Sequence, residues 1–321
     1  MNKKEQKKIL SIVSPAYNEA ENLGEFYSRV TNATDNLNLE IEIIYINDGS
    51  QDSTIDIITK QRQIDNRITI IDLSRNFGKE IALTAGLDYS SGDAVIVIDA
   101  DLQDPPELIP KLVEKWREGY DVVNAKRIKR KGESLLKKVM SYIYYRLLFY
   151  LSDINVPRDT GDFRLLNKNA LDALLKLREK HRYMKGLFVW VGFKQKEIEY
   201  EREARFKGKT KWGFFSLFNL AFDGLTSFSI MPLRLASTIG FLSALIGFFY
   251  GAVIVFKTLF FHEPVAGFTS LVVLITFFGG IQLLSIGIIG EYIGRIFNET
   301  KNRPLYVVKN IQGSIFLDKP Q

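Results

Sequence analysis

Short apolar runs alternate with helical patterns through the first part of the chain. The apolar runs are rich in β-branched residues and nearly continuous, which is typical of parallel strands covered on both faces. Helical patterns fill the gaps between these runs, and the alternation predicts a doubly wound α/β sheet. The expected strands span 9–15, 41–48, 67–74, 94–100 and 120–126, and the expected helices span 19–37, 52–65, 79–90 and 106–118.

Two later segments are far more apolar than the rest of the chain. Residues 235–260 hold one charged side chain, Lys257, and residues 268–290 hold none. Each is longer than the roughly 20 residues that a helix needs to cross a bilayer, whereas buried core helices fit apolar segments of about 10–14 residues. The pattern therefore predicts two membrane-spanning helices, and the near-neutral mean hydropathy averages a soluble part with a membrane part.

The charges that flank the two spans predict their orientation. The loop between the spans, 261–267, contains no Lys or Arg. Because Lys and Arg concentrate on the cytoplasmic side of membrane proteins, we expect the large soluble domain and both termini to be cytoplasmic. The flanking basic residues are Lys207, Lys209, Lys211 and Arg234 before the first span, and Arg295, Lys301, Arg303 and Lys309 at the end of the second span and beyond it.

Two segments of the soluble part, 132–153 and 211–229, combine an apolar or aromatic face with neighbouring basic residues. Such helices suit the headgroup region of a membrane, and packing against the sheet is the alternative. The net charge of +6 and the pI of about 9.2 favour an anionic membrane surface as partner. We expect no nucleic-acid partner, because the sequence contains no recognition module for one.

Polar side chains follow each expected strand at its carboxyl end. In a doubly wound sheet these ends meet at one edge, where ligands bind. Taken alone, "NDGS" is a turn signal and "YNEAEN" is a helix start, but five strand ends with acids, amides and basic residues favour a binding site at this edge. The segments are 17–19, 47–50, 74–76, 99–103 and 126–127.

One strand end, "VIVIDADLQDPPE" (95–107), runs from apolar residues into three acids. Asp104 precedes two prolines, which is the pattern of a helix N-cap. That pattern does not explain Asp99 and Asp101, because like charges at a strand end repel one another and cost desolvation free energy. Two carboxylates placed two residues apart therefore favour a shared metal cation.

Six motifs in chain order resemble those of polyprenyl-phosphate glycosyltransferases. They are "SIVSPAYNEAENL", "YINDGSQDST", "LSRNFGKEIALTAGLDYSSGD", "VIDADLQDPPE", "DTGDFRLLN" and "GEYIGRIFNETKNRPLY". Together with the paired C-terminal spans, the resemblance covers nearly the whole chain. It is to the inverting GT-A class of family 2 that includes dolichyl-phosphate mannose synthases, and within that class to the bacterial bactoprenol glucosyltransferase (GtrB) type.

The resemblance implies a GT-A domain that binds a nucleotide sugar together with Mg²⁺ or Mn²⁺. Family members hold the cation with D-x-D and a following Gln, here Asp99, Asp101 and Gln103, which agrees with the preference of hard cations for oxygen ligands. The cation and the diphosphate would also offset the repulsion between the acids. The resemblance further places Pro15, Tyr17, Glu19 and Asp48 at the nucleoside and Arg127 at the diphosphate, although "NAKR" departs from the commoner "GSR"; Lys79 either faces phosphate or has a capping or surface role.

On the acceptor side the resemblance implies a polyprenyl phosphate, which is undecaprenyl phosphate in a bacterium. Arg205, Lys209 and Lys211 precede the first span. They either clamp the lipid phosphate or attract anionic lipid in general. Asp162 in "GDFR" matches the family's catalytic base, ahead of the nearby Asp159. Because a phosphate monoester has a second pKa near 6, Asp162 either removes the last proton or orients the acceptor.

The sequence therefore predicts an inverting, metal-dependent β-glycosyltransferase at the cytoplasmic face of a bacterial plasma (inner) membrane. UDP-glucose is the favoured donor, and UDP-galactose, UDP-GlcNAc, a modified arabinose and GDP-mannose stay open. One alternative is a membrane-bound nucleotide-sugar-binding or lipid-linked-sugar transport protein without transferase activity, but neither span has an ionisable residue at its centre to mark a transport pathway. Another is a processive polysaccharide synthase, but no Gln begins the Q-x-x-R-W pattern of those enzymes.

The patterns divide the chain into four expected regions. Residues 1–131 form the nucleotide-sugar-binding core, and 132–231 supply the interface helices, the acceptor-side loop and the rest of the catalytic domain. Residues 232–298 hold the two spans, and 299–321 form a cytoplasmic tail with a strand.

The second span also predicts self-association. Small residues at helical spacing let helices pack closely in lipid, and a contact between the two spans of one chain is the alternative use for them. We expect a homo-oligomer, a tetramer, in which the C-terminal strand joins a neighbouring subunit. The glycines are Gly279, Gly280, Gly287, Gly290 and Gly294.

Overall fold

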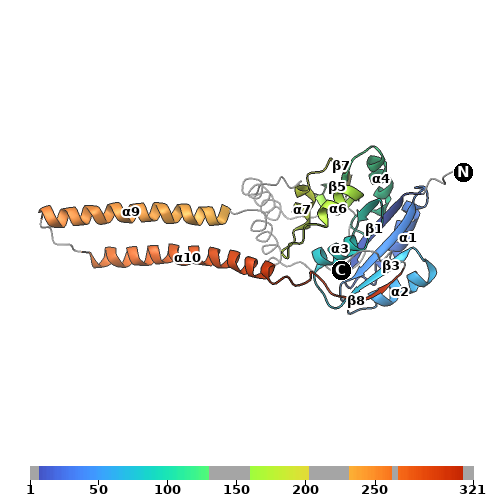
Figure 1. Ribbon diagram of the computed structural model, residues 1–321, viewed down its shortest axis with the longest axis horizontal. Coiled ribbons are helices and arrows are strands. Elements are labelled where there is room, and N and C mark those ends of the chain that lie inside the picture. Colours follow the sequence, from blue (N-terminus) through green and yellow to red (C-terminus); the bar gives the residue numbers. More distant parts are fainter. Residues whose placement is uncertain (1–6, 130–159, 202–230, 262–266, 314–321) are drawn as a thin grey trace.

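The structure is a computed structural model that describes residues 7–129, 160–201, 231–261 and 267–313. An α/β domain forms its main body, and two long helices extend from this domain side by side (Figure 1). The predicted fold class is therefore confirmed. The amphipathic segments 132–153 and 211–229, predicted as interface helices, lie outside the described residues.

Eight strands form one mixed sheet in the order β7-β5-β6-β4-β1-β2-β3-β8. Its centre consists of four parallel neighbours whose apolar runs were predicted as strands. The first of them, β1, explains the two-sided burial: Leu10 and Ile12 face one layer of helices, Val13 faces the other, and all three are fully buried. The central strands are β1 (Ile9–Ala16), β2 (Glu40–Asn47), β3 (Ile68–Leu73) and β4 (Ala94–Val97).

The remaining strands make the sheet mixed. The fifth predicted strand, β5 (Val122–Lys129), does not pair with β4, because β6 (Thr160–Asn167) lies between them and runs antiparallel to both. β7 (Gln195–Glu201) pairs parallel with β5 at one edge, and β8 (Val308–Gln312) pairs antiparallel with β3 at the other. A doubly wound sheet is confirmed, with antiparallel strands that the apolar runs did not reveal.

Helices cover both faces of the sheet, and all four predicted helices are among them. The first face packs against α1 (Leu23–Thr34), α2 (Thr54–Ile64) and α4 (Ile109–Arg117), with the 3-10 turn η1 (Pro106–Leu108) leading into α4. The second face packs against α3 (Lys79–Asp88), α6 (Lys168–Leu174) and α7 (Met184–Trp190). The core therefore lies in two layers, one on each side of the sheet.

The antiparallel strand β6 decides which residues reach the carboxyl edge of the sheet. In the β4–β6 ladder Ala94 lies opposite Asn167 and Val97 lies opposite Arg164. The beginning of β6 therefore lies beside the end of β4. As a result Asp162 reaches the same edge as Asp99, although Asp162 lies near the amino end of its own strand.

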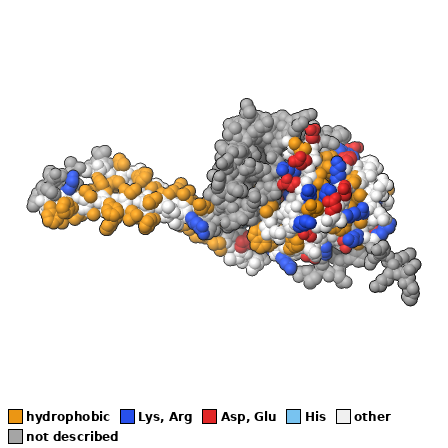
Figure 2. Space-filling model, turned by 90° about the horizontal axis from the view of Figure 1, so that it is seen from above, with side chains coloured by type: hydrophobic (Ala, Val, Ile, Leu, Met, Phe, Trp, Pro, Cys, Tyr) orange, Lys and Arg blue, Asp and Glu red, His pale blue; other side chains and the backbone are white. Residues whose placement is uncertain are grey.

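The two C-terminal helices are α9 (Met231–Phe261) and α10 (Phe268–Thr300). The stretches Leu233–Lys257 and Ser270–Thr300 each have a mean hydropathy of 2.3, and both are long and apolar enough to cross a membrane. Figure 2 shows apolar side chains along the helix pair, in contrast with the mixed charges of the α/β domain. Their exposure in the single chain is what a lipid-facing hairpin requires.

The C-terminal strand returns to the domain of its own chain. In β8, Ile311 lies opposite Ile71 of β3, and the Tyr306 hydroxyl just before the strand donates to Asp88 Oδ2 at 2.8 Å. The predicted strand is present, but the expectation that it joins a neighbouring subunit is wrong in this structure. The edge of β3 lies within reach of the few residues after α10, so the chain pairs with itself.

Further contacts hold the end of α10 against the α/β domain. The backbone N–H of Lys180 donates to Glu299 Oε1 at 2.7 Å, and the side chains of His181 and Asn298 meet at 3.2 Å. Arg178 donates to the same Asp88 oxygen that accepts from the Tyr306 hydroxyl. The domain and the hairpin are therefore joined by polar contacts as well as by the connecting chain.

One close packing contact gives a stability prediction. A Cβ atom on Gly86 of α3 would lie 2.4 Å from Val13 Cγ1 and 2.5 Å from Ile46 Cδ1, so α3 approaches β1 and β2 as closely as it does because this residue is glycine. We expect Gly86→Ala to destabilise the domain by about 1–3 kcal/mol through overpacking. Thermal unfolding of the full-length protein in detergent, followed by tryptophan fluorescence, measures this as a lower midpoint temperature.

Gly24→Ala is the matched control. Gly24 lies in the first turn of the helix α1, and a Cβ atom there meets nothing within 4 Å. Equal midpoint temperatures for the two variants would contradict the packing argument.

Candidate active site

Hydrogen bonds join the loops that follow β1 and β2. The backbone N–H of Asn18 donates to Ser50 Oγ at 3.0 Å, and Asn18 Oδ1 accepts from the N–H of Gln51 at 2.8 Å. Asn47, at the end of β2, donates through Nδ2 to Asp72 Oδ1 on β3 at 2.7 Å. These bonds fix the first part of the rim that the sequence predicted.

Asp48 positions the loop that leads into α3. Its two carboxylate oxygens accept the backbone N–H groups of Phe77 at 2.7 Å and Gly78 at 3.0 Å. The neighbouring Gly49 has a φ of +68°, and a Cβ there would lie 2.5 Å from the backbone nitrogen of Asn76. Asp48 thus places Lys79, the first residue of α3; its predicted contact with a nucleoside stays a prediction.

The other predicted nucleoside residues lie at the same part of the rim. Pro15 is half-buried in β1 opposite Ile46, and Tyr17 is half-buried just after the strand. Glu19 begins the chain's turn into α1, since its Oε2 accepts from Asn22 Nδ2 at 2.7 Å. The structure brings the three residues together at the strand end, and their role toward a nucleoside stays a prediction.

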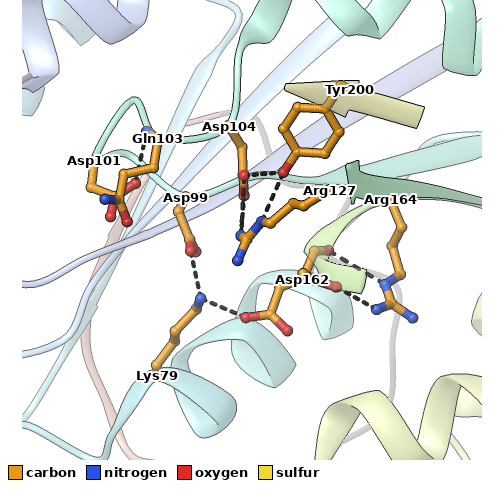
Figure 3. A network of polar contacts seen from close by, with 10 residues as sticks. Lys79, Asp99, Asp101, Gln103, Asp104, Arg127, Asp162, Arg164 and Tyr200 are labelled. Atoms are coloured by element: carbon orange, nitrogen blue, oxygen red, sulfur yellow. Dashed lines mark hydrogen bonds and ion pairs between the residues drawn. The ribbon is translucent and has the colours of Figure 1, made fainter. Parts of the chain in front are cut away.

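The acidic turn after β4 is held in an unusual conformation. Leu102 has a φ of +57°, which is a costly value for a bulky side chain, and its side chain is buried. This turn lets the N–H of Gln103 donate to Asp101 Oδ1 at 3.1 Å, and Figure 3 shows Asp101 and Gln103 beside each other with Asp99 nearby. Backbone strain at this point accompanies the gathering of three oxygen-bearing side chains.

These three side chains fit a partial cation site. Within the described part of the chain, no group of three or more acidic, histidine or cysteine residues forms a ready metal cage. Mg²⁺ typically uses only one or two protein carboxylates and completes its shell with waters and substrate phosphates. Two carboxylates and an amide oxygen at an open sheet edge match that pattern, so Asp99, Asp101 and Gln103 fit a cation that arrives with a diphosphate.

Lys79 bridges the two sides of the site. Its Nζ lies 2.6 Å from Asp99 Oδ2 and 2.5 Å from Asp162 Oδ2 (Figure 3). Burial raises the pKa of Asp99 above its usual value, Lys79 opposes the increase, and Asp162, Asp101 and Asp104 add to it. The sequence did not predict these contacts with two acids, and the phosphate contact that it left open for Lys79 stays a prediction.

Asp104 and Arg127 form a buried ion pair. The Arg127 Nη2 lies 3.1 Å from both oxygens of Asp104, and the Tyr200 hydroxyl contacts Asp104 and accepts from Arg127 Nε at 2.9 Å. The interpretation of Asp104 as an N-cap is wrong, because no side chain caps the turn at Pro105. Gly161 leaves room for the arginine, because a Cβ atom added there would lie 2.5 Å from Arg127 Nη2.

Asp162 is buried at the start of β6 and stays ionised. Burial alone would raise its pKa, but Lys79, Lys185 and Arg164 hold the pKa well below its usual range. Arg164 donates to the carbonyl oxygens of Gly161 at 2.7 Å and Asp162 at 3.4 Å, and its guanidinium stacks on the ring of Phe188. Arg164 therefore orients the backbone that carries Asp162.

The structure adds residues to the site that sequence reasoning missed. Arg164 lies in the quoted "DTGDFRLLN" motif, which was the available signal, whereas Tyr200 lies on β7 and no local pattern pointed to it. The predicted acceptor-side residues Arg205, Lys209 and Lys211 lie outside the described residues, as does Asp159.

Comparison with known proteins identifies the family. The model of glycosyl transferase family 2 matches residues 11–175, and the model of the GtrB C-terminal hairpin matches residues 231–296. A bactoprenol glucosyl transferase of Shigella phage SfV is 45% identical over 301 residues, which cover 94% of this chain and 98% of the relative. The uncharacterised glycosyltransferase YkcC of Bacillus subtilis (strain 168) is 48% identical over 303 residues, 94% of each chain.

Another relative, the prophage bactoprenol glucosyl transferase homolog of Escherichia coli (strain K12), is 43% identical over 303 residues, which cover 94% of this chain and 99% of the relative. The likeness to solved structures is distant. Glucosyl-3-phosphoglycerate synthase from Mycobacterium tuberculosis, for example, is 20% identical, with a TM-score of 0.44 over 67% of this chain and 76% of that one. Sequence similarity over nearly its whole length, together with both matched models, shows that this chain belongs to glycosyl transferase family 2 and carries a C-terminal hairpin of the GtrB type.

Proposed function

We propose that this protein transfers a sugar, with glucose as the leading candidate, from a nucleotide sugar to a polyprenyl phosphate with inversion at the anomeric carbon. The observation that carries the proposal is the near-full-length similarity to relatives named bactoprenol glucosyl transferase, which includes both the sheet domain and the C-terminal hairpin. UDP-glucose is the donor that we expect. The product would be a polyprenyl-phosphate-linked β-glucose.

The donor side is assigned to the rim formed by the first four strands. We propose that Pro15, Tyr17, Glu19 and Asp48 line the nucleoside position, as the family resemblance implies. Asp99, Asp101 and Gln103 would hold Mg²⁺ or Mn²⁺, which would neutralise charge on the departing nucleotide diphosphate. We also propose that Arg127 faces the diphosphate; its Nε and Nη2 contact Tyr200 and Asp104, which fix the guanidinium in place.

The acceptor side is assigned to Asp162 and to the basic residues before the first span. One oxygen of Asp162, Oδ1, is buried and accepts no hydrogen bond from the residues that the structure describes. Because the acceptor phosphate is largely ionised at neutral pH, we propose that Asp162 positions the acceptor and is not needed chiefly to remove a proton. Arg205, Lys209 and Lys211 are proposed to contact the lipid phosphate.

The proposed setting is the bacterial plasma membrane. The two apolar helices support membrane association, and the distribution of basic residues favours a hairpin with the catalytic domain and both termini in the cytoplasm. We retain the four regions 1–131, 132–231, 232–298 and 299–321 as the proposed division into donor core, interface part, spans and tail.

Self-association is also part of the proposal, with a tetramer as the expected state. Added Cβ atoms on Gly287, Gly290 and Gly294 of α10 meet nothing within 4 Å in the described residues. These glycines therefore do not serve a close contact with α9 there, and they leave a smooth helix face in lipid. Native mass spectrometry from mild detergent reads the oligomeric state, and a monomer would contradict the proposal.

The central experiment is a donor panel with undecaprenyl phosphate. Full-length protein in detergent or nanodiscs is supplied in turn with UDP-glucose, UDP-galactose, UDP-GlcNAc and GDP-mannose, and the lipid extract is read by mass spectrometry. We expect a hexosyl-phosphate lipid from UDP-glucose. Binding of a nucleotide sugar without any lipid-linked product would support a binding or transport protein instead of a transferase.

The metal proposal predicts that EDTA abolishes transfer and that Mg²⁺ or Mn²⁺ restores it. Asp101→Ala removes one of the two carboxylates, so we expect turnover to fall by about 10²–10³-fold, the effect of losing several kcal/mol of charge stabilisation. Initial rates with saturating lipid measure the loss.

Asp172→Ala is the control for the Asp101 variant, because Asp172 is a half-exposed acid on α6, away from the rim. Undiminished turnover in EDTA would remove the metal from the mechanism. Equal losses from both variants would show that the effect of Asp101→Ala is general.

The positioning role of Asp162 predicts an unusual pH profile for Asp162→Asn. A general base contributes about 10²–10⁴-fold, and a variant that lacks only a base would recover as rising pH ionises the remaining acceptor, whose second pKa is near 6. We expect instead that the loss persists from pH 6 to 9, since Lys79 and its neighbours hold Asp162 ionised throughout that range.

Turnover at saturating lipid, measured for both proteins across that range, decides the role of Asp162. At saturating Mg²⁺ or Mn²⁺, donor affinity should stay nearly unchanged in Asp162→Asn. Recovery to a near wild-type rate above pH 8 would assign the role of general base to Asp162.

A further inference from the structure

Lys79 occupies a position that the proposed chemistry does not by itself explain. The residue begins α3, directly after Gly78, whose φ is +94°. Its side chain reaches back over the rim and contacts one carboxylate from the end of β4 and one from the beginning of β6. A single ammonium group therefore joins the proposed metal side of the site, at Asp99, to the proposed acceptor side, at Asp162 (Figure 3).

The surrounding charges show why a cation lies at this point. Asp101 and Asp104 add negative charge near Asp99, and Arg127 lies against Asp104. On the other side, Lys185 and Arg164 lower the pKa of Asp162, and Asp162 in turn helps to raise the pKa of Glu80, the acid next to Lys79. Lys79 is the ammonium group that directly contacts both Asp99 and Asp162 in the described residues.

A divalent cation at Asp99 would add a second positive charge beside the Lys79 ammonium group. A carboxylate that already contacts an ammonium attracts a divalent cation less strongly, because the two positive charges repel one another. Asp162 offers Lys79 an alternative partner at 2.5 Å, so the ammonium keeps a contact when its hold on Asp99 is weakened.

We propose that Lys79 is a tethered counter-ion that competes with the divalent cation for Asp99 and that shifts toward Asp162 when the cation binds. Lys79 is then a positioning residue that couples occupation of the donor site to the charge around the acceptor-side carboxylate. The inference rests on the proposed transferase function for the role of the cation, but not on any measurement of transfer.

The test is Mn²⁺ affinity, measured on full-length protein in detergent by electron paramagnetic resonance of free Mn²⁺, with and without UDP. Lys79→Met keeps the length of the side chain and removes its charge. We expect Mn²⁺ to bind roughly tenfold more tightly or better, since one neighbouring charge shifts the proton affinity of a carboxylate by about 1–3 pKa units. A lysine with only a structural role would give weaker binding when it is removed.

Lys115→Met is the matched control. Lys115 forms an ion pair with Glu118 at the far end of α4, so the substitution removes the same charge away from the rim. We expect wild-type Mn²⁺ affinity. Equal tightening in both variants would assign the effect to net charge and overturn the proposal.

A double-mutant cycle tests the shift toward Asp162. Asp162→Asn removes the alternative partner of Lys79, so we expect it to weaken Mn²⁺ binding in the wild-type background and to have a much smaller effect in the Lys79→Met background. Equal effects in both backgrounds would show that Lys79 does not relay charge between the two carboxylates.

The double variant combines Lys79→Met with Asp162→Asn, so it removes one positive and one negative charge. It keeps the proposal testable if Lys79→Met alone does not fold. It should bind Mn²⁺ more than tenfold more tightly than Asp162→Asn alone, because Asp162→Asn weakens binding mainly while Lys79 is present. Unchanged or weaker Mn²⁺ binding in both Lys79→Met and this double variant overturns the proposal, as does wild-type protein that binds no Mn²⁺ under either condition. Weaker UDP binding with unchanged Mn²⁺ affinity would make Lys79 a phosphate contact instead.

The outcome is separable from that of the donor panel. Transfer of glucose with unaltered Mn²⁺ affinities would leave the proposed function in place and remove the role of Lys79. The expected affinities without any transfer product would support the role of Lys79 and remove the proposed transferase function.

Discussion

Crowded negative charge at one end of a buried sheet is the constraint on which the site depends. An ionised carboxylate is costly in low-dielectric surroundings unless a cation or a hydrogen-bond donor meets it. Here the partners come from different elements: Arg127 of β5 meets Asp104, and Lys79 of α3 meets two acids at once. The rim therefore forms only when β4, β5, β6 and α3 are all in place. The acids concerned are Asp99, Asp101, Asp104 and Asp162.

The position of Lys79 follows from a chain of contacts that begins at the end of β2. Asp48 at the end of β2 holds the backbone of Phe77 and Gly78, and this fixes where α3 begins. The close approach of α3 at Gly86 then fixes the rest of the helix against β1 and β2. On the other side, the antiparallel direction of β6 brings Asp162 to the same edge. A parallel strand at that place would have delivered its carboxyl end to the rim instead.

The sequence was sufficient for the elements whose burial is expressed in a continuous apolar run or in a helical pattern of apolar positions. Strands β1 to β5 and helices α1 to α4 belong to this class, and so do the two apolar C-terminal helices. Strand β6 does not, because "TGDFRLLN" contains a buried aspartate that pairs with Lys79 of α3 and a buried arginine that stacks on Phe188 of α7. A polar strand of this kind has no local signature, and its antiparallel placement depends on tertiary packing.

In the candidate site, too, the sequence predicted the features that local patterns express and missed those that depend on tertiary packing. Strand ends predicted which loops meet, and the spacing of Asp99 and Asp101 predicted where oxygen ligands gather. The sequence could not predict which side chains pair with one another, since Asp104 and Arg127 are 23 residues apart and Tyr200 joins them from a strand at the sheet edge. Locally, an aspartate before two prolines looks the same whether it caps a helix or contacts an arginine. For the C-terminal strand, only the path after α10 distinguishes its own sheet from that of a neighbour.

The contacts of the C-terminal segment bear on how the rim of the α/β domain is held relative to the two apolar helices. Asp88 at the end of α3 accepts from Arg178 and from Tyr306, and β8 then pairs with β3. The helix that carries Lys79 at its first residue is thus joined at its last residue to the chain that leaves the hairpin. Because a headgroup has a fixed depth in the membrane, contacts of this kind limit how far the rim can move relative to it. A loosely tethered domain would have to lose that freedom at each encounter with acceptor, so the return of the C-terminus to its own sheet favours a site held ready at the membrane surface.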